Sequence, residues 1–425
     1  MPPCRCRMKR AAVVPDKPRR PPRAGISTQR SPAIVGGLPA FAQPVYLTRP
    51  RVPNEAAFTE LVSGMFRARW FTNDGALVRE LERRLRDRLG TAFCAALCNG
   101  TVALQVALRS LDLDGEVITT PFTFPATVHA ITWTGLTPVF CDIDPDTYNL
   151  DVGAASGLVS DRTSALLPVH VFGNPCDVTA IQRLADGNGL KVVYDAAHAF
   201  GVSQGGRSIG CWGDLSVFSF HATKLFHTCE GGAVVGRDSA LLRRIALLRN
   251  FGIVNEEEVC GVGLNGKLSE LHAAMGLSLI DAVDEEIRLR GELSARYNAH
   301  LGGIDGLRFQ RRRGDATPNY AYYTIEVEED GFGLSRDDLH RALRAENVLV
   351  RKYFHPLCSE NEAYRHLASA DPARLPNAHR LSSQILSLPL YGDLPLEDVD
   401  KIAECILAIR AAAPSVRAAA RSGRS

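Results

Sequence analysis

Short apolar runs and helical patterns alternate along the chain between about residues 80 and 250. The apolar runs predict strands at 92–98, 116–120, 138–142, 165–171, 191–195, 215–219 and 233–236. Amphipathic stretches between several of these runs predict helices at 102–111, 126–134 and 179–188. Buried strands separated by helices are typical of a doubly wound α/β fold, with a mostly parallel sheet between two layers of helices. We therefore expect a seven-stranded sheet that binds its ligands at the carboxyl ends of the strands.

The pattern changes after residue 252 and predicts a smaller α+β unit. A long helix is expected at 269–299, followed by a strand at 322–327 and by helices at 336–346 and 397–412. Because 425 residues exceed one ordinary core, a large domain and a smaller one are expected. The long helix would bridge the two.

The predicted boundaries divide the chain into four parts. The large α/β domain is placed at 45–285 and the small C-terminal α+β domain at 286–412. Residues 1–44 are rich in proline and arginine and are expected to form a disordered basic extension. Residues 413–425 are expected to be a flexible tail.

Composition narrows the possible classes of protein. The hydrophobic fraction of 45% and the charged fraction of 23% are those of a globular protein. The net charge of +2 indicates no particular partner, and much of the positive excess lies near the two ends. The basic N-terminus could be a nucleic-acid arm or a transit peptide, but a flexible extension is the simpler interpretation. Nucleic acid is therefore not an expected partner.

The chain has no signals for a membrane or a metal. No apolar run approaches the roughly 20 residues of a membrane helix, so we expect a cytoplasmic protein. The eleven cysteines are scattered, as small buried residues are in a reducing compartment. Their spacing lacks the pairs of a zinc site, and the acidic segment 142–146 lacks the glycine and glutamate of a calcium loop.

One lysine follows an apolar strand directly. Lys224 ends the segment Ser219-Phe-His-Ala-Thr-Lys224, and Glu230-Gly-Gly comes shortly after it. Burial lowers the pKa of an amine, and a neutral lysine can form a Schiff base. A lone lysine at a strand end is more often exposed to solvent, so the interpretation depends on other motifs.

Two further motifs lie at strand ends. Asn99-Gly100-Thr101 stands between a strand and a helix, where backbone N–H groups can bind a phosphate, although it could be only a turn with a helix cap. Asp195 ends another apolar run, where an ionised carboxylate needs a cationic partner. A protonated pyridine nitrogen is such a partner, and a strand-end cap is the alternative.

Taken together in chain order, these three motifs resemble those of fold-type I pyridoxal-phosphate (PLP) enzymes. Within that class the chain is similar to the nucleotide-sugar aminotransferases often named DegT-type, over roughly residues 45–410. The resemblance implies PLP as cofactor, with Lys224 as the Schiff-base lysine and Asp195 as the partner of the pyridine nitrogen. It also implies a homodimer with shared active sites.

The resemblance extends to other cofactor contacts. His198 would lie near the phenolic oxygen of the cofactor, and Phe124 would stack on its ring. Gly100, Thr101 and Ser219 would contact the phosphate, whereas Asn265 would reach a phosphate in the neighbouring subunit.

The segments 70–75, 115–127, 169–176 and 351–357 resemble enzymes that aminate C4 of a TDP-4-keto-6-deoxyhexose. The expected reaction moves an amino group from an amino acid to that ketone, and glutamate is the expected donor. Lys224 would act as general base and acid. Candidate residues for the diphosphate are Arg249, Arg351 and Lys352. His170 and Tyr353 are candidates for the sugar pocket, although either could be an ordinary strand or loop residue.

Alternative functions remain open at this point. A C3 keto-sugar aminotransferase and a PLP-dependent sugar dehydrase use the same fold and cofactor. Related sugar dehydrases have another residue in place of the anchoring lysine. Lys224 is present here, which favours transamination. A regulatory protein that kept the fold without turnover is the alternative outside the enzymes.

Overall fold

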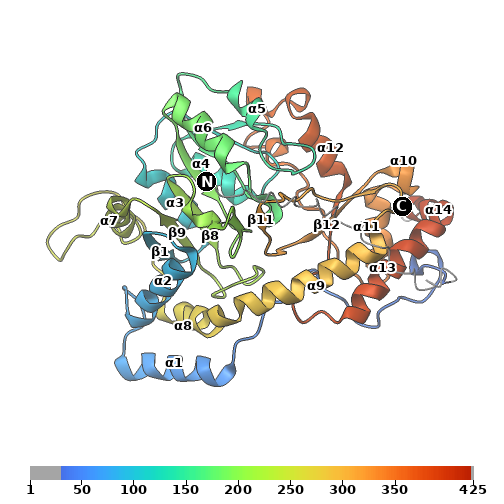
Figure 1. Ribbon diagram of the computed structural model, residues 1–425, viewed down its shortest axis with the longest axis horizontal. Coiled ribbons are helices and arrows are strands. Elements are labelled where there is room, and N and C mark those ends of the chain that lie inside the picture. Colours follow the sequence, from blue (N-terminus) through green and yellow to red (C-terminus); the bar gives the residue numbers. More distant parts are fainter. Residues whose placement is uncertain (1–29, 423–425) are drawn as a thin grey trace, which may run out of the picture.

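The computed structural model describes residues 30–422 of the chain (Figure 1). Its centre is a seven-stranded sheet in the order β1-β9-β8-β5-β4-β2-β3. The strands are β1 (Phe93–Leu97), β2 (Glu116–Thr119), β3 (Thr137–Phe140), β4 (Thr163–Leu167), β5 (Lys191–Asp195), β8 (Leu215–Ser219) and β9 (Gly232–Gly236). Only β9 runs antiparallel to its two neighbours. The predicted seven-stranded, mostly parallel sheet is therefore confirmed.

Helices cover both faces of this sheet. One face packs on α2 (Ala76–Leu89), α6 (Val178–Asn188) and α8 (Glu270–Leu279). The other packs on α3 (Gly100–Ser110), α4 (Pro125–Trp133) and α7 (Ser239–Leu248). Successive strand residues divide between these two apolar cores, as the pleat requires. This is the doubly wound α/β class that the sequence predicts.

Two further helices belong to this part of the chain. Helix α1 (Glu55–Ala68) lies against α8, and the short α5 (Val152–Ser156) lies near α6. A small antiparallel sheet consists of β6 (Ser203–Gln204), β7 (Arg207–Ser208) and β11 (Ala316–Thr317). Its strand β11 comes from the C-terminal part of the chain and pairs with β6 of this part.

A second antiparallel sheet has its own core. It contains β10 (Leu307–Arg308), β12 (Tyr323–Val327) and β13 (Ile385–Leu388), with β12 in the middle. Its helices are α9 (Val283–Leu301), α10 (Glu329–Phe332), α11 (Arg336–Ala345), α12 (Pro376–Gln384), α13 (Leu396–Ala411) and α14 (Ala413–Ser422).

Helix α9 joins the two cores (Figure 1). Val283 at its start is buried in the core of the central sheet, whereas Leu293 and Tyr297 are buried in the core of the second sheet. The single helix expected at 269–299 is in fact α8 and α9, separated by the 3-10 turn Ile280–Ala282. The bridging role expected of that helix falls to α9, while the domain boundary at 285/286 stays a prediction.

The chain ends differ from the expectation. Residues 30–44 are not a disordered extension, because Phe41 is buried in the second core and Glu346 accepts hydrogen bonds from the backbone N–H groups of Ala33 and Ala40, at 2.8 and 2.7 Å. Residues 413–422 form α14 rather than a flexible tail. The predictions for residues 1–29 and 423–425 lie outside the described part of the chain.

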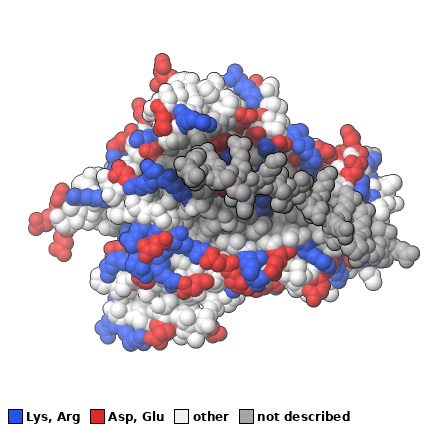
Figure 2. All heavy atoms as spheres, viewed as in Figure 1, with Lys and Arg blue, Asp and Glu red and all other residues white. Residues whose placement is uncertain are grey.

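Charges of both signs are interspersed on the face seen in Figure 2. The arginine-rich helix α2 is an example, since Arg83 pairs with Glu80 at 2.7 Å and with Asp87 at 2.9 Å. Within residues 30–422, no helix is long and apolar enough to cross a bilayer. No cluster of three or more His, Cys, Asp or Glu side chains in the same range has the arrangement of a metal site.

Candidate active site

The candidate catalytic residues meet at the carboxyl edge of the central sheet. Asp195 is the last residue of β5 and Ser219 the last of β8, the neighbouring parallel strand. Lys224 follows β8 in a short turn, and a small pocket brings it together with His198 and Ser219. Parallel strands deliver their carboxyl ends to one edge, so motifs distant in sequence become neighbours.

Lys224 is half-buried and faces a tyrosine. Its Nζ lies 3.5 Å from the hydroxyl oxygen of Tyr322. Desolvation lowers the pKa of Lys224, and the negative charge of Asp195 partly opposes that shift. A lysine with a lowered pKa is neutral in a larger fraction of molecules, which is the form that attacks a carbonyl.

Asp195 is a buried carboxylate without a salt bridge to any residue in 30–422. Thr127 Oγ1 donates to its Oδ2 at 2.7 Å, and the backbone N–H of Ala197 donates to its Oδ1 at 3.0 Å. Burial raises the pKa of Asp195, and the Thr127 hydrogen bond opposes this. A buried acid with two donors and no ion-pair partner fits the protonated ring nitrogen of PLP.

Replacement of Thr127 by valine is expected to shift the acid limb of the pH–activity profile to higher pH. The hydrogen bond from Thr127 stabilises the ionised form of Asp195, so its loss raises the pKa of that carboxyl. Because the ionised form is the one proposed to hold a protonated ring nitrogen, activity is expected to disappear at a higher pH as the solution is acidified. The pH profile of kcat/KM measures the shift, and an unmoved acid limb would contradict this role of Thr127.

The start of α3 forms an anion cradle. The Asn99 side chain accepts from the backbone N–H of Val102 at 2.8 Å and caps the helix, which begins at Gly100. The first N–H groups of a helix have no partner within the helix, and the helix dipole places positive potential there. Gly100 faces Ser219 so closely that a Cβ would lie 2.9 Å from Ser219 Cβ. Gly100, Thr101 and Ser219 thus fit the phosphate of PLP.

The Gly100→Ala variant is expected to bind PLP more weakly by roughly tenfold or more, since overpacking of this kind costs about 1–3 kcal/mol. The added methyl group would push against Ser219 inside the cradle. Titration of the cofactor-free protein with PLP, followed by absorbance, measures the affinity. Gly187→Ala in α6 is the control, because a Cβ there meets nothing within 4 Å. Equal affinities for the two variants would contradict the assignment.

His198 is a neutral hydrogen-bond donor in this site. The backbone N–H of Phe172 donates to its Nδ1 at 3.3 Å, so its proton must lie on Nε2. Burial lowers the pKa of His198 well below its usual value. The imidazole lies parallel to the ring of Phe354, with ring centroids 6.0 Å apart. A neutral Nε2–H group is suited to the cofactor's phenolic oxygen, as the resemblance implies.

Phe124 and Asn265 lie at the surface of the chain. The Phe124 ring is 53% exposed and precedes α4. Asn265 is also exposed, and its Oδ1 accepts from Lys267 Nζ at 2.9 Å. Ring stacking by Phe124 and a contact of Asn265 with a neighbouring subunit both stay predictions.

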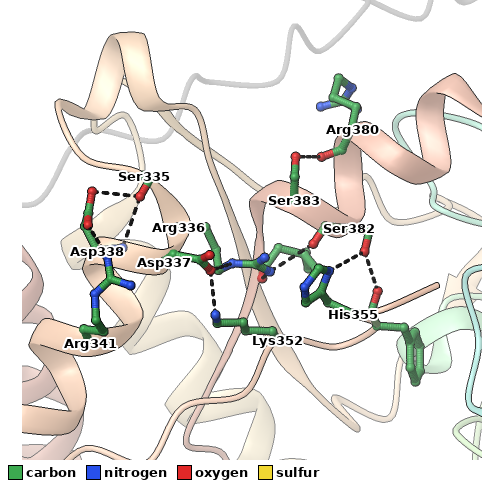
Figure 3. A network of polar contacts seen from close by, with 12 residues as sticks. Ser335, Arg336, Asp337, Asp338, Arg341, Lys352, His355, Arg380, Ser382 and Ser383 are labelled. Atoms are coloured by element: carbon green, nitrogen blue, oxygen red, sulfur yellow. Dashed lines mark hydrogen bonds and ion pairs between the residues drawn. The ribbon is translucent and has the colours of Figure 1, made fainter. Parts of the chain in front are cut away.

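The substrate candidate Lys352 belongs to a polar network (Figure 3). Lys352 Nζ forms an ion pair with Asp337 at 2.6 Å, and Asp337 also pairs with Arg336 at 2.6 Å. The guanidinium of Arg351 stacks on the Tyr353 ring at 4.4 Å.

The remainder of this network fixes the segment 351–355. Ser382 Oγ donates to the carbonyl oxygen of Phe354 at 2.8 Å, and Arg336 donates to the carbonyl of Ser382 at 2.9 Å. The segment therefore reaches the site from the second sheet. Tyr353 contacts Tyr322, a residue that lines the pocket, edge to face, with ring centroids 5.8 Å apart. Its place in the sugar pocket stays a prediction.

Arg249 and His170 have other partners. Arg249 pairs with Glu82, donates to the carbonyl of Ala96 at 2.8 Å and has a side chain only 12% exposed. The His170 ring is fully buried and stacks on Tyr194 at 4.7 Å. Because Tyr194 and Asp195 are successive strand residues, their side chains point to opposite faces of the sheet. His170 therefore packs on the face away from Asp195, and the structure does not support its expected place in the sugar pocket.

Several residues of the site have no assignment from sequence. Thr127 lies within the segment 115–127 but is one of many threonines in the chain. Tyr322, Asn319 and Phe354 come from the second unit and approach the site only through folding. A sequence motif does not show contacts between residues that are far apart in the chain.

Fold and site together define a PLP-dependent aminotransferase. The chain belongs to the DegT/DnrJ/EryC1/StrS aminotransferase family, which it matches over residues 54–407. It is 40% identical to the dTDP-4-amino-4,6-dideoxy-D-glucose transaminase of Escherichia coli, over 85% of this chain and 97% of that protein. The predicted family, enzyme class and cofactor are confirmed.

Solved structures agree with this membership. The structure of DesI in the presence of its TDP-sugar product matches with a TM-score of 0.85 and 40% identity, over 92% of this chain and 98% of DesI. S. venezuelae DesV, in complex with a ketimine intermediate, matches with a TM-score of 0.78 and 30% identity, over 84% of this chain and 94% of DesV.

Proposed function

We propose that this enzyme transfers an amino group to the C4 ketone of a TDP-4-keto-6-deoxyhexose and so forms a TDP-amino-dideoxy sugar. The observation that carries the proposal is the 40% identity over almost the full length of a dTDP-4-amino-4,6-dideoxy-D-glucose transaminase. The similarity to DesI, whose structure was determined with its TDP-sugar product, supports the same nucleotide and sugar class.

The residues of the site suit the two halves of a transamination. PLP, when bound, supplies an electron sink that stabilises a carbanion next to nitrogen. Ionised Asp195 would keep a ring nitrogen of the bound cofactor protonated, and His198 would offer it a neutral Nε2–H donor. The amine of Lys224 removes a proton from the α-carbon of the amino donor and returns one to the sugar carbon in the second half.

The amino donor and the assembly are part of the proposal. L-glutamate is the expected donor, and a homodimer with shared sites would bring the exposed Asn265 to a neighbouring subunit. A cytoplasmic location likewise stays a prediction.

A C3 aminotransferase is the second candidate. The UDP-N-acetyl-3-dehydro-alpha-D-glucosamine 3-aminotransferase of Acidithiobacillus ferrooxidans is 31% identical over 77% of this chain, so the family spans both positions of amination. The lower identity makes C4 the preferred position. The dehydrase alternative is disfavoured because Lys224 is present.

Incubation of the PLP-loaded enzyme with L-glutamate and a small panel of TDP-keto sugars tests the proposal. We expect an amine at C4 of the 6-deoxyhexose, identified by mass spectrometry and NMR, with equimolar 2-oxoglutarate. An amine at C3, or a deoxygenated sugar without nitrogen, would overturn it.

A further inference from the structure

Tyr322 contacts the reacting atom of the lysine from the opposite side of the site. Its hydroxyl oxygen is 3.5 Å from Lys224 Nζ, and its ring lies 4.9 Å from the imidazole of His198. Tyr322 directly precedes β12, so it comes from the second sheet, whereas Lys224 comes from the central one. We propose that Tyr322 is a catalytic residue that holds the free amine of Lys224, and that Arg290 of α9 is the positioning residue for Tyr322.

The segment before Tyr322 is held firmly against the central sheet. Asn319 Nδ2 donates to the carbonyl oxygens of His198 at 2.8 Å and of Phe200 at 2.9 Å. Asn319 Oδ1 accepts from the backbone N–H of Ala321 at 3.0 Å. One buried amide thus ties the chain around Tyr322 to the loop that carries His198.

A buried ion pair on α9 holds the same segment from the other side. Arg290 and Glu286 are 3% and 2% exposed, and Arg290 Nε donates to Glu286 Oε1 at 2.6 Å. Another nitrogen of the same guanidinium donates to the carbonyl oxygen of Ala321 at 3.2 Å. Because the guanidinium is a rigid fork, one side chain fixes both its acid and the residue next to Tyr322.

Glu286 is itself fixed by two further donors. Arg51 contributes a hydrogen bond at 3.0 Å, and the backbone N–H of Gly392 contributes another at 3.0 Å. A buried carboxylate with this many donors stays ionised, so Arg290 keeps its place. The path from Glu286 through Arg290 and Ala321 to Tyr322 is therefore continuous.

The hydroxyl of Tyr322 can serve the lysine in both protonation states. Burial raises the pKa of Tyr322 to about 12, so the phenol stays protonated. Its oxygen accepts a hydrogen bond from the ammonium form of Lys224, and its O–H donates to the lone pair of the neutral form. Hydrogen bonds to a charged partner are the stronger ones, so the net effect of the hydroxyl is to favour the ammonium. The proposal deepens the proposed function at the same site.

The test compares Tyr322→Phe with Tyr320→Phe. Tyr320 is a neighbouring residue whose hydroxyl makes no hydrogen bond to residues 30–422 in this structure. An amine-specific reagent modifies the cofactor-free protein over a range of pH, and peptide mass spectrometry follows Lys224. In Tyr322→Phe the labelling midpoint is expected to fall by about one pH unit, because the ammonium loses an acceptor. In the loaded enzyme the half-reaction with glutamate is expected to slow about tenfold or more. An unmoved midpoint, or the same fall in Tyr320→Phe, would overturn the role of Tyr322.

Arg290→Lys tests the positioning role. Lysine keeps a positive charge beside Glu286 but lacks the second arm of the fork that reaches Ala321. In Arg290→Lys we expect the labelling midpoint of Lys224 to fall by less than in Tyr322→Phe. The circular dichroism spectrum should be unchanged. In the Tyr322→Phe background the same substitution should add nothing. An equal shift in both backgrounds would mean that Arg290 acts by another route. Neither measurement requires the sugar, so failure of the C4 assignment and failure of this inference remain distinguishable.

Discussion

Lys224→Ala is expected to abolish transamination, with kcat lowered by at least about 10⁴-fold. Two roles are proposed for the side chain, as covalent anchor of PLP and as the group that moves the proton, and none of its described neighbours in the pocket is another lysine. The yellow colour of the bound cofactor should disappear, and glutamate should cause no absorbance change. Spectra and single-turnover kinetics measure both effects.

Lys191→Ala is the matched control. Lys191 is the first residue of β5, at the end of the strand opposite to Asp195, and pairs with Asp214 at 3.2 Å. Its loss should leave the colour and the rate unchanged. A Lys224→Ala protein that retained the colour and turned over would contradict the assignment of the anchor.

Asp195→Asn is expected to lower kcat by about 10²–10⁴-fold, since an uncompensated buried charge costs about 3–5 kcal/mol. Asparagine keeps the shape of the side chain and can still accept from Thr127, but it has no charge to hold a protonated ring nitrogen. The protein should therefore still bind PLP, and the loss should appear in the half-reaction with glutamate.

Asp238→Asn serves as the control for this substitution. Asp238 caps α7 by accepting from the backbone N–H of Ala240 at 2.9 Å, and asparagine caps helices equally well. Stopped-flow measurement of the half-reaction compares the two variants. Similar rates for Asp195→Asn and the unaltered enzyme would contradict the pairing with the ring nitrogen.

Hydrophobic patterning predicted the central sheet well because its strands are buried on both faces. The strand expected at 215–219 is β8 without any change, and Lys224 and Asp195 follow from their positions at strand ends. The strand expected at 165–171 ends earlier, at Leu167, because the apolar run continues into the 3-10 turn Val171–Gly173. Continuous burial therefore marks a strand but does not fix its end.

Features that depend on tertiary contacts were not predictable in the same way. His170 is a candidate for the pocket from its segment 169–176, with an ordinary strand residue as the alternative, and its ring in fact stacks on Tyr194. Arg249 is tied to Glu82, a residue far from it in sequence. Tyr322 has no motif of its own, because its contact with Lys224 exists only when the second sheet packs against the first.

The bridge from Arg351 to Ser387 of β13 attaches the segment 351–355 to the second sheet, whereas the lysine, the aspartate and the anion cradle belong to the central one. The residues proposed to hold the cofactor and the residues proposed to face the sugar are thus encoded in separate stretches of the gene. Substitutions within 351–355 can therefore change the sugar preference of descendants without touching the residues that hold the cofactor.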